Sequence, residues 1–419
     1  MQVVRFPSWA PLPRRPDTHR PALLHEQPVV GVGAEIGLDP ARRAALLAQT
    51  TQAWAPSDVI DFGIGHPQDA ILPTDIFRRA MANGIEPYPL QYGTEFGDGY
   101  LRLALAEFLT AAYGVTCDPE STFITNGNSQ AIDQVCSVFT KPGDVVFVEE
   151  PSYFLALDIF RQHHVRIVGI PVDEHGLRLD ALEAALAIER PAFLYTIPTF
   201  QNPTGYTLPV ERREQLVALA QKHEFLIVAD EVYHLLSYGG DVPPPMAAWI
   251  ASGVVLSLGT FTKILAPGLR LGWIQAAVPL LERLAGAGLI VSGGGLNPFT
   301  SAIVAPLIEN GSLRNYLDFL IATYSERVEV MNEALKLYFP AGITYDVPSG
   351  GYFFWLRFPV GTDTATFLTS AAAHKVGFRC GSKFTVDGRL ANYMRLSFAY
   401  YDSTTIERGI SALAQAITG

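Results

Sequence analysis

The sequence has only three cysteines among its 419 residues, Cys117, Cys136 and Cys380, and they lie far apart in the chain. An odd number at this spacing forms neither a disulfide framework nor a metal-ligand pattern, so we interpret all three as structural thiols. His163 and His164 have no carboxylate or cysteine at ligand spacing. We therefore expect no metal site.

Long apolar runs and an excess of basic charge are also missing. No stretch approaches the ~18 to 20 apolar residues that a membrane helix needs, and residues 1–7 contain no signal-peptide core. Lys and Arg number 30 against 41 Asp and Glu, a formal net charge of -11. Nucleic-acid binding needs clustered basic residues. We expect a cytoplasmic protein that binds neither membranes nor nucleic acid, although one local arginine site for a small anion is compatible with this charge.

The length and composition indicate a packed protein with more than one domain. A chain of 419 residues exceeds the usual size of a single core, and 49% hydrophobic with 17% charged residues is typical of a packed α/β protein. Residues 1–38 are rich in Pro and Arg and predict an N-terminal arm, and a helix is expected after Asp39. We expect residues 39–74 to belong to a small domain, 75–305 to form a large domain, and 306–419 to complete the small domain.

Hydrophobic patterning predicts an α/β fold. Strand-like and helix-like runs alternate between about residues 75 and 275, which indicates βαβ units and a mostly parallel central sheet flanked by helices. The expected strands are 121–125, 144–148, 165–170, 192–196, 225–229 and 254–258, with a helix at 210–220. Beyond about 305, a long amphipathic helix (313 to about 337) and short strands at 352–356 and 393–398 predict a smaller α+β domain.

Polar motifs follow several of these strands, where open parallel sheets bind ligands. Gly127 opens a helix whose free N–H groups suit a phosphate, although the turn also reads as an ordinary N-cap. Tyr153 could stack on a flat heterocycle or pack in the core. Asn202 could donate to a phenolate oxygen. Asp230 places a carboxylate at a strand end, or caps a helix.

A lysine and an arginine seven residues apart suggest a bound aldehyde and a bound phosphate. Lys263 follows an apolar run and two threonines, and Arg270 follows in the stretch 266–273. A lysine can hold an aldehyde as a Schiff base, and a guanidinium can bind phosphate in a bidentate manner. Alone, such a lysine reads as a solvated loop, so the interpretation depends on the other motifs.

Six motifs together resemble one known family. Asn-Gly-Asn-Ser-Gln, Glu-Pro-Ser-Tyr, Gln-Asn-Pro-Thr-Gly, Ala-Asp-Glu-Val-Tyr, Thr-Phe-Thr-Lys and Ala-Pro-Gly-Leu-Arg-Leu-Gly-Trp occur in the order seen in class I/II aminotransferases of the fold-type I pyridoxal-phosphate enzymes. The resemblance covers roughly residues 40–415. It is strongest to the branch of 2-aminoadipate aminotransferases and the aminotransferase half of MocR-type regulators. Those regulators carry a DNA-binding domain ahead of this unit, and we expect none here.

The resemblance implies a role for each motif residue with pyridoxal 5'-phosphate as the cofactor. Lys263 would form the internal aldimine and act as general base, and Asp230 would bind the pyridine nitrogen. The other implied cofactor contacts are Asn202 and Tyr233 at the 3-hydroxyl oxygen, Tyr153 on the ring face, and Tyr92, Gly127, Asn128, Ser129, Thr260, Thr262 and Arg270 at the phosphate. Tyr92 would reach the phosphate of the neighbouring subunit, which implies a homodimer with shared active sites.

Substrate contacts are implied at Arg395, which would bind the α-carboxylate, helped by Asn202 and the loop around Gly65. An arginine in an apolar strand favours a carboxylate partner because an unpaired buried charge is costly. Candidates for lining the side-chain site are Ile36, Gln68, Tyr92 and residues 293–298, although the glycines at 293–295 read better as a tight interdomain turn. No second arginine is clearly placed for a distal carboxylate, which favours neutral, aromatic or branched amino acids over Asp and Glu.

The expected activity is amino transfer between an L-amino acid and a 2-keto acid. A decarboxylase, an oxidase or a β- or γ-eliminase would use the same cofactor residues and remains an alternative at this stage. A regulator or scaffold without turnover fits less well, because the lysine, aspartate and arginine set is complete.

Overall fold

The computed structural model describes residues 58–82, 84 and 86–419. The expected N-terminal arm, the helix after Asp39 and the candidate pocket residue Ile36 lie outside these residues. Within the described ranges, no helix has the length and apolarity required to cross a membrane.

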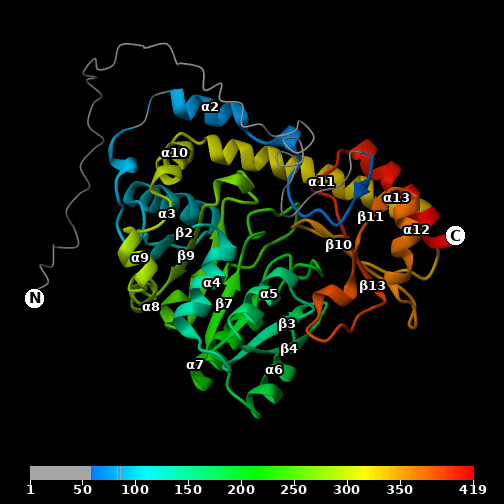
Figure 1. The fold of residues 1–419 in the computed structure, drawn as a ribbon, viewed down its shortest axis with the longest axis horizontal. Coiled ribbons are helices and arrows are strands. Elements are labelled where there is room, and N and C mark those ends of the chain that lie inside the picture. The colour runs from blue at the N-terminus through cyan, green and yellow to red at the C-terminus, as the bar shows by residue number, and fades with distance from the viewer. Residues whose placement is uncertain (1–57, 83, 85) are drawn as a thin grey trace, which may run out of the picture. The chain divides into compact units, whose positions relative to one another are not determined.

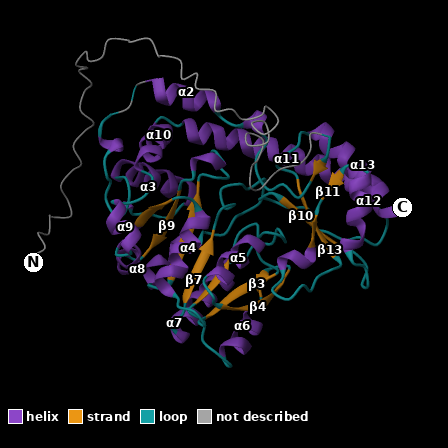
Figure 2. Cartoon of the chain, in the orientation of Figure 1, coloured by secondary structure: helices purple, strands orange, loops and turns teal. Residues whose placement is uncertain are grey.

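The central feature is an eight-stranded, mostly parallel sheet (Figures 1 and 2). Its spatial order is β2-β9-β8-β7-β6-β3-β4-β5, and the pairs from β8 to β4 are parallel. The strands are β2 (Thr122–Thr125), β3 (Val145–Glu150), β4 (Arg166–Asp173), β5 (Gly176–Leu177), β6 (Phe193–Thr196), β7 (Leu226–Asp230), β8 (Val255–Thr260) and β9 (Gly272–Ala276). The α/β fold and all six predicted strands are confirmed.

Alternate residues of the central strands face two separate cores. In β6, Leu194 packs in one hydrophobic cluster, while Phe193 and Tyr195 pack in the other. Both faces are therefore covered, which explains why these strands are nearly continuous apolar runs. Residues of α6 (Leu179–Leu186) and α7 (Val210–His223) cover the Leu194 face. Residues of α3 (Gly99–Tyr113), α4 (Asn128–Phe139), α5 (Phe154–Gln162), α8 (Val278–Ala285), α9 (Gly288–Gly293) and α10 (Pro298–Glu309) belong to the other cluster.

The C-terminal part is a smaller α+β arrangement. The predicted long helix is confirmed as α11 (Ser312–Tyr338), and a three-stranded antiparallel sheet has the order β10-β13-β12. The strands of this sheet are β10 (Phe353–Arg357), β13 (Tyr393–Ser397) and β12 (Arg379–Cys380). The C-terminal part also contains α12 (Leu368–Ala373), β11 (Val376–Gly377) and α13 (Ser403–Thr418). Figure 1 shows α12, α13 and β13 gathered beside the large sheet.

An early segment joins this C-terminal part. Strand β1 (Ile60–Asp61) pairs in parallel with β11, and Ser397 N–H donates to Phe62 O at 2.8 Å. The helix that follows, α2 (Thr74–Ala82), packs against α10. The loop after β1 is thereby held near β13. The domain limits at 38, 74 and 305 stay a prediction.

Candidate active site

Asp230 ends β7 as a fixed, buried carboxylate. Its side chain is 3% exposed. The hydroxyl of Tyr195 donates to one carboxylate oxygen at 2.7 Å, and Asn128 Nδ2 donates to the other at 2.6 Å. Burial raises the pKa of Asp230, while these two hydrogen bonds and the charge of Lys263 oppose the rise. Sequence reasoning missed Tyr195 as a site residue, because a tyrosine in an apolar strand reads as core.

The start of α4 departs from the expected arrangement at one side chain. Asn128 was expected at the phosphate, but its amide group is hydrogen-bonded to Asp230. Its backbone N–H remains at the first turn of α4, where unpaired N–H groups attract anions. Ser129 is exposed at the next position.

Gly127 caps α4 in a conformation that a side chain would not tolerate. Its backbone has φ 82° and ψ 171°, a region restricted to glycine. A Cβ there would lie 3.0 Å from Arg270 Nη2. The exposed Arg270 side chain therefore lies against the N-terminus of α4.

Lys263 follows β8 with its amine directed at the loop after β1. Its Nζ donates to Gly65 O at 2.8 Å and lies 5.4 Å from the centre of the Tyr352 ring. Burial lowers the pKa of Lys263 to about 8, helped by the positive charges of Arg395 and Arg270 and opposed by Asp230. The amine is therefore mostly charged at pH 7, but its uncharged fraction is much larger than that of an ordinary lysine.

Two hydroxyls precede this lysine. Thr260 is 4% exposed, and its Oγ1 donates to Thr262 Oγ1 at 2.8 Å. Thr262 N–H in turn donates to Thr260 Oγ1 at 3.1 Å. The two side chains thus form one polar turn at the end of β8.

Arg395 on β13 is a buried cation at the other end of the site. It is 3% exposed, and its two Nη atoms donate to Asn202 Oδ1 at 3.0 Å and Gly63 O at 2.8 Å. The guanidinium carbon lies 4.1 Å from the centre of the Phe353 ring. Burial lowers the pKa of Arg395 to about 10, so it stays charged at neutral pH. Its Nε is buried and has no hydrogen-bond partner in the chain.

Three tyrosines were expected at the cofactor. Burial raises the pKa of Tyr153 to about 12 and raises that of Tyr233, so both hydroxyls stay protonated. The charges of Asp230 and Arg395 act on both hydroxyls, so both tyrosines lie near these two groups. Tyr92 differs, because it is 82% exposed in this chain.

The candidate pocket residues have structural partners. Gln68 Oε1 accepts from Arg327 Nη2 at 2.6 Å. Gly295 has φ 85°, and a Cβ there would lie 1.9 Å from Thr94 O. This close backbone approach favours the tight-turn interpretation of the glycines.

Several buried polar atoms near these motifs have no hydrogen-bond partner. The buried side-chain N and O atoms without a hydrogen-bond partner in the described part of the chain are Thr125 Oγ1, Asn128 Oδ1, Ser152 Oγ, Arg395 Nε and the two amide atoms of Gln275. The first four adjoin or belong to the motifs described above. Buried polar groups are normally hydrogen-bonded. These atoms, the amine of Lys263 and the anion-binding end of α4 fit a ligand with an aldehyde, a phosphate and a polar ring.

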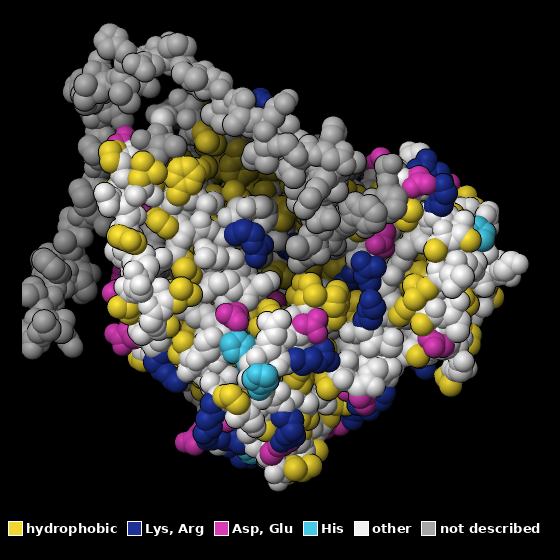
Figure 3. Space-filling view, viewed as in Figure 1, with side chains coloured by type: hydrophobic (Ala, Val, Ile, Leu, Met, Phe, Trp, Pro, Cys, Tyr) yellow, Lys and Arg dark blue, Asp and Glu magenta, His cyan; other side chains and the backbone are white. Residues whose placement is uncertain are grey.

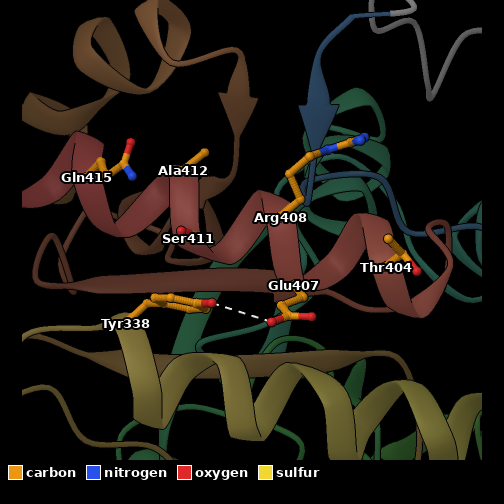
Figure 4. Close-up of a pocket in the computed structure, with 7 residues that line it drawn as sticks. All are labelled: Tyr338, Thr404, Glu407, Arg408, Ser411, Ala412 and Gln415. Carbon is orange, nitrogen blue, oxygen red and sulfur yellow. Dashed lines mark hydrogen bonds between the residues drawn. The ribbon is translucent and has the colours of Figure 1, made fainter.

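A groove elsewhere in the molecule contains none of these residues. It lies along α13 and the end of α11, with a volume of about 460 Å³, and Tyr338 donates to Glu407 across it (Figure 4). Its lining carries a positive charge at Arg408 and a negative charge at Glu407. We assign it no function.

Comparison with known proteins identifies the family. Residues 57–413 match the family model described as aminotransferase class I and II. The chain is 37% identical to aromatic-amino-acid aminotransferase 1 of Thermococcus litoralis, over 90% of this chain and 92% of the relative.

Two solved structures are similar along nearly the whole chain. The multiple substrate aminotransferase of Thermococcus profundus superimposes with a TM-score of 0.81 at 35% identity, covering 92% of this chain and 96% of that one. The α-aminoadipate aminotransferase of Thermus thermophilus, complexed with N-(5'-phosphopyridoxyl)-L-leucine, has a TM-score of 0.79 at 32% identity, covering 87% and 93%. These relatives are aminotransferases, which favours transamination over the decarboxylase, oxidase and eliminase alternatives. The chain belongs to the class I and II aminotransferases and is a pyridoxal-phosphate-dependent aminotransferase.

Proposed function

We propose that Lys263, Asp230 and Arg395 carry out the central tasks of the transamination. When bound, pyridoxal phosphate supplies an aldehyde and an electron-withdrawing ring that accepts the negative charge developing at the donor α-carbon. Lys263 Nζ takes the α-proton as general base and returns it one step later. The observation that carries this proposal is the placement of the Lys263 amine, which donates to Gly65 O at 2.8 Å and is near the charges of Asp230 and Arg395. Its lowered pKa, about 8, suits an amine that both accepts and releases a proton.

Asp230 holds a positive charge on the ring nitrogen. A carboxylate beside a basic nitrogen raises the pKa of that nitrogen. The hydrogen bonds from Tyr195 and Asn128 hold the carboxylate in place, so the assigned role of the Asn128 side chain is to orient Asp230. The geometry of Asp230 therefore depends on residues of β6 and α4.

The phosphate group binds at the end of β8 and the start of α4. Backbone N–H groups of Asn128 and Ser129 supply the positive end of a helix. Thr260 and Thr262 supply hydroxyls, and Arg270 supplies a guanidinium beside Gly127. Phosphate binds well to such combined backbone and guanidinium donors.

Asn202 joins the cofactor side of the site to the substrate side. Its Oδ1 accepts from Arg395, so its Nδ2 is the group that donates to the 3-hydroxyl oxygen of the cofactor, together with the Tyr233 hydroxyl. Tyr153 stacks on the ring face. Arg395 binds the substrate α-carboxylate through its unpartnered Nε, and the backbone around Gly65 bounds the site on the other side.

A homodimer completes the site. Tyr92 is exposed in this chain, and in a dimer it would reach the phosphate of the neighbouring subunit. Tyr92 belongs to a set of exposed apolar residues on α2, α9, α10 and the turn before Tyr92. We call this set the apolar face, and its members are Met81, Tyr88, Leu90, Tyr92, Leu289, Val291 and Phe299. Figure 3 shows hydrophobic side chains gathered near α2 and α10. Apolar patches of this kind mark protein interfaces.

Neutral donors, aromatic or branched, are the favoured substrates. Sequence reasoning placed no second arginine near Arg395, but Arg379 lies directly opposite it in the strand register. Arg379 Nη1 is 3.5 Å from Asp61 Oδ2, so a carboxylate of the chain already balances part of its charge. The relative named for aromatic amino acids supports this preference. The Thermus enzyme does not discriminate, because it holds a leucine adduct but is named for α-aminoadipate, which has a distal carboxylate.

A panel of donors tests this preference. Holoenzyme is mixed with single L-amino acids without a keto acid, and the absorbance change of the bound cofactor is followed. We expect faster conversion with Phe, Tyr, Trp and Leu than with Asp, and Arg379→Gln should not abolish it. A clear preference for dicarboxylic donors that is lost in Arg379→Gln would overturn the substrate assignment.

A further inference from the structure

Three charged side chains are buried beneath the loops that carry the site. Glu149, Arg213 and Glu231 are 1%, 0% and 4% exposed. Glu149 belongs to the end of β3, Arg213 to α7, and Glu231 follows Asp230 directly. None of the roles proposed above uses them. Burying charges is costly unless they are paired and hydrogen-bonded, so the partners of these three side chains indicate their role.

Arg213 binds both ends of the loop that carries Asn202. Its Nη2 donates to Pro198 O at 2.8 Å and to Thr199 Oγ1 at 2.9 Å, and its Nε donates to Leu208 O at 2.8 Å. Leu208 N–H also donates to Pro198 O at 2.8 Å, which closes the loop 198–208 at its base. One guanidinium therefore fixes the two points where this loop begins and ends.

Glu149 contacts the same loop directly, and Glu231 is connected to it through Arg213. Glu231 Oε1 lies 3.7 Å from Arg213 Nη1 and accepts from Met246 N–H at 2.8 Å. Glu149 accepts from Ile197 N–H at 3.0 Å and from Gln201 Nε2 at 3.2 Å. Burial lowers the pKa of Arg213 to about 10, opposed by the negative charges of both glutamates, so Arg213 stays charged.

Gln201 extends the network to the residue beside Asn202. Its Nε2 also donates to Pro151 O at 2.7 Å, next to the loop that holds Tyr153, and its Oε1 accepts from Thr204 N–H at 2.9 Å. Asn202 thus sits in a loop held at its base by Arg213 and at its tip by Gln201. Fully satisfied buried networks of this kind make a backbone rigid.

We propose that Arg213 is a positioning residue for transamination, because its planar fork fixes the loop 198–208 and so holds Asn202 between the cofactor oxygen and Arg395. This inference rests on the role proposed above for Asn202. Arg213 itself touches neither substrate nor cofactor. A lysine keeps the charge but cannot hold the three carbonyl and hydroxyl acceptors in one plane.

The test compares Arg213→Lys with Arg212→Lys as holoenzymes. Arg212 is the adjacent residue of α7, and it pairs with Asp173 at 2.7 Å instead of binding the loop 198–208. We expect Arg213→Lys to raise the donor KM and to lower kcat/KM by about 10- to 100-fold, since small misplacements of substrate-positioning groups have effects of this size. The pH at which the absorbance of the bound cofactor titrates should shift too, because Asn202 contacts its ring oxygen. Arg212→Lys should change neither.

Two results would contradict the inference. One is a loss of thermal stability in Arg213→Lys with KM, kcat/KM and the absorbance titration unchanged, which would make Arg213 purely structural. The other is an equal change of KM, kcat/KM and the absorbance titration in Arg212→Lys.

If Arg213→Lys does not fold, Thr199→Val removes one acceptor of the guanidinium with little change in shape. It should give a smaller shift of the same sign, and no shift would overturn the inference.

Asn202→Ala separates this inference from the proposed function. A normal KM and a normal absorbance titration in Asn202→Ala would refute the role of Asn202 and with it the basis of the inference. If Asn202→Ala shifts both while Arg213→Lys shifts neither, the inference about Arg213 alone is wrong.

Discussion

The reaction chemistry depends on the amine of Lys263. Its pKa is lowered from 10.5 to about 8 because the amine is buried and near two cationic side chains. Only the uncharged amine attacks an aldehyde, so the rate at which cofactor-free protein captures pyridoxal phosphate should rise with pH up to about 8 and then level off. Stopped-flow absorbance measures it. A rate that keeps rising towards pH 10.5, as for an ordinary lysine, would contradict the lowered pKa.

Arg395 allows a second prediction at the scale of single residues. Arg395→Lys keeps a positive charge but loses the fork that contacts Asn202, Gly63 and the proposed carboxylate. Hydrogen bonds to charged groups contribute about 1.5–3 kcal/mol, so the donor KM should rise about 10- to 100-fold. Steady-state kinetics checks this. Arg357→Lys, an exposed arginine on β10, is the control and should behave like the wild type. Unchanged affinity in Arg395→Lys would place the carboxylate elsewhere.

At the scale of elements, the sequence predicts the strands well and their neighbours less well. The six predicted strands were found because each apolar run is bounded by turn residues. Strand β9 was missed, since its first residue, Gly272, reads as part of a phosphate motif. Gly272 is needed there because a Cβ would lie 2.7 Å from Gly259 O on the adjacent strand. That contact depends on pairing between distant segments, which a local pattern does not contain.

The same limit explains the side-chain contacts at the site that the sequence does not indicate. The motifs named the residues at the strand ends, and the structure brings most of them together. Tyr195 reaches Asp230 because β6 and β7 are adjacent strands. The orientation of the Asn128 side chain depends on how α4 packs on the sheet. Arg379 lies opposite Arg395 only because of the register of β12 and β13. The individual roles of the site residues and the cytoplasmic location stay predictions.

The first turn of α4 can be tested through its glycine. Gly127→Ala puts a Cβ 3.0 Å from Arg270 Nη2 in a backbone region that costs about 1–3 kcal/mol for other residues. We expect weaker binding of pyridoxal phosphate and a lower melting temperature. Titration of cofactor-free protein measures the affinity. Gly143→Ala, also at positive φ but with nothing within 4 Å of the added Cβ, controls for backbone strain. Equal cofactor affinity in the two variants would mean that Gly127 does not shape the phosphate site.

At the scale of the whole molecule, the apolar face predicts a homodimer. Leu289 and Val291 on α9 are 70% and 58% exposed. Leu289→Asp combined with Val291→Asp should shift the protein towards monomer in sedimentation velocity. It should also weaken cofactor binding, because Tyr92 would no longer reach the partner's phosphate site. Leu337→Asp, at a 69% exposed position on α11, is the control. A wild type that sediments as a monomer while fully active would refute the shared site.

The role of Lys263 is tested most directly by a single half-reaction. Holoenzyme, Lys263→Ala and the surface control Lys336→Ala are each loaded with pyridoxal phosphate and mixed with a donor amino acid without a keto acid. We predict that the wild type and Lys336→Ala convert the cofactor and release one equivalent of keto acid. Lys263→Ala should bind the cofactor through its phosphate contacts but convert it about 10²- to 10⁴-fold more slowly, which is the range expected for loss of a general base. Conversion at the wild-type rate in Lys263→Ala would contradict the proposed mechanism.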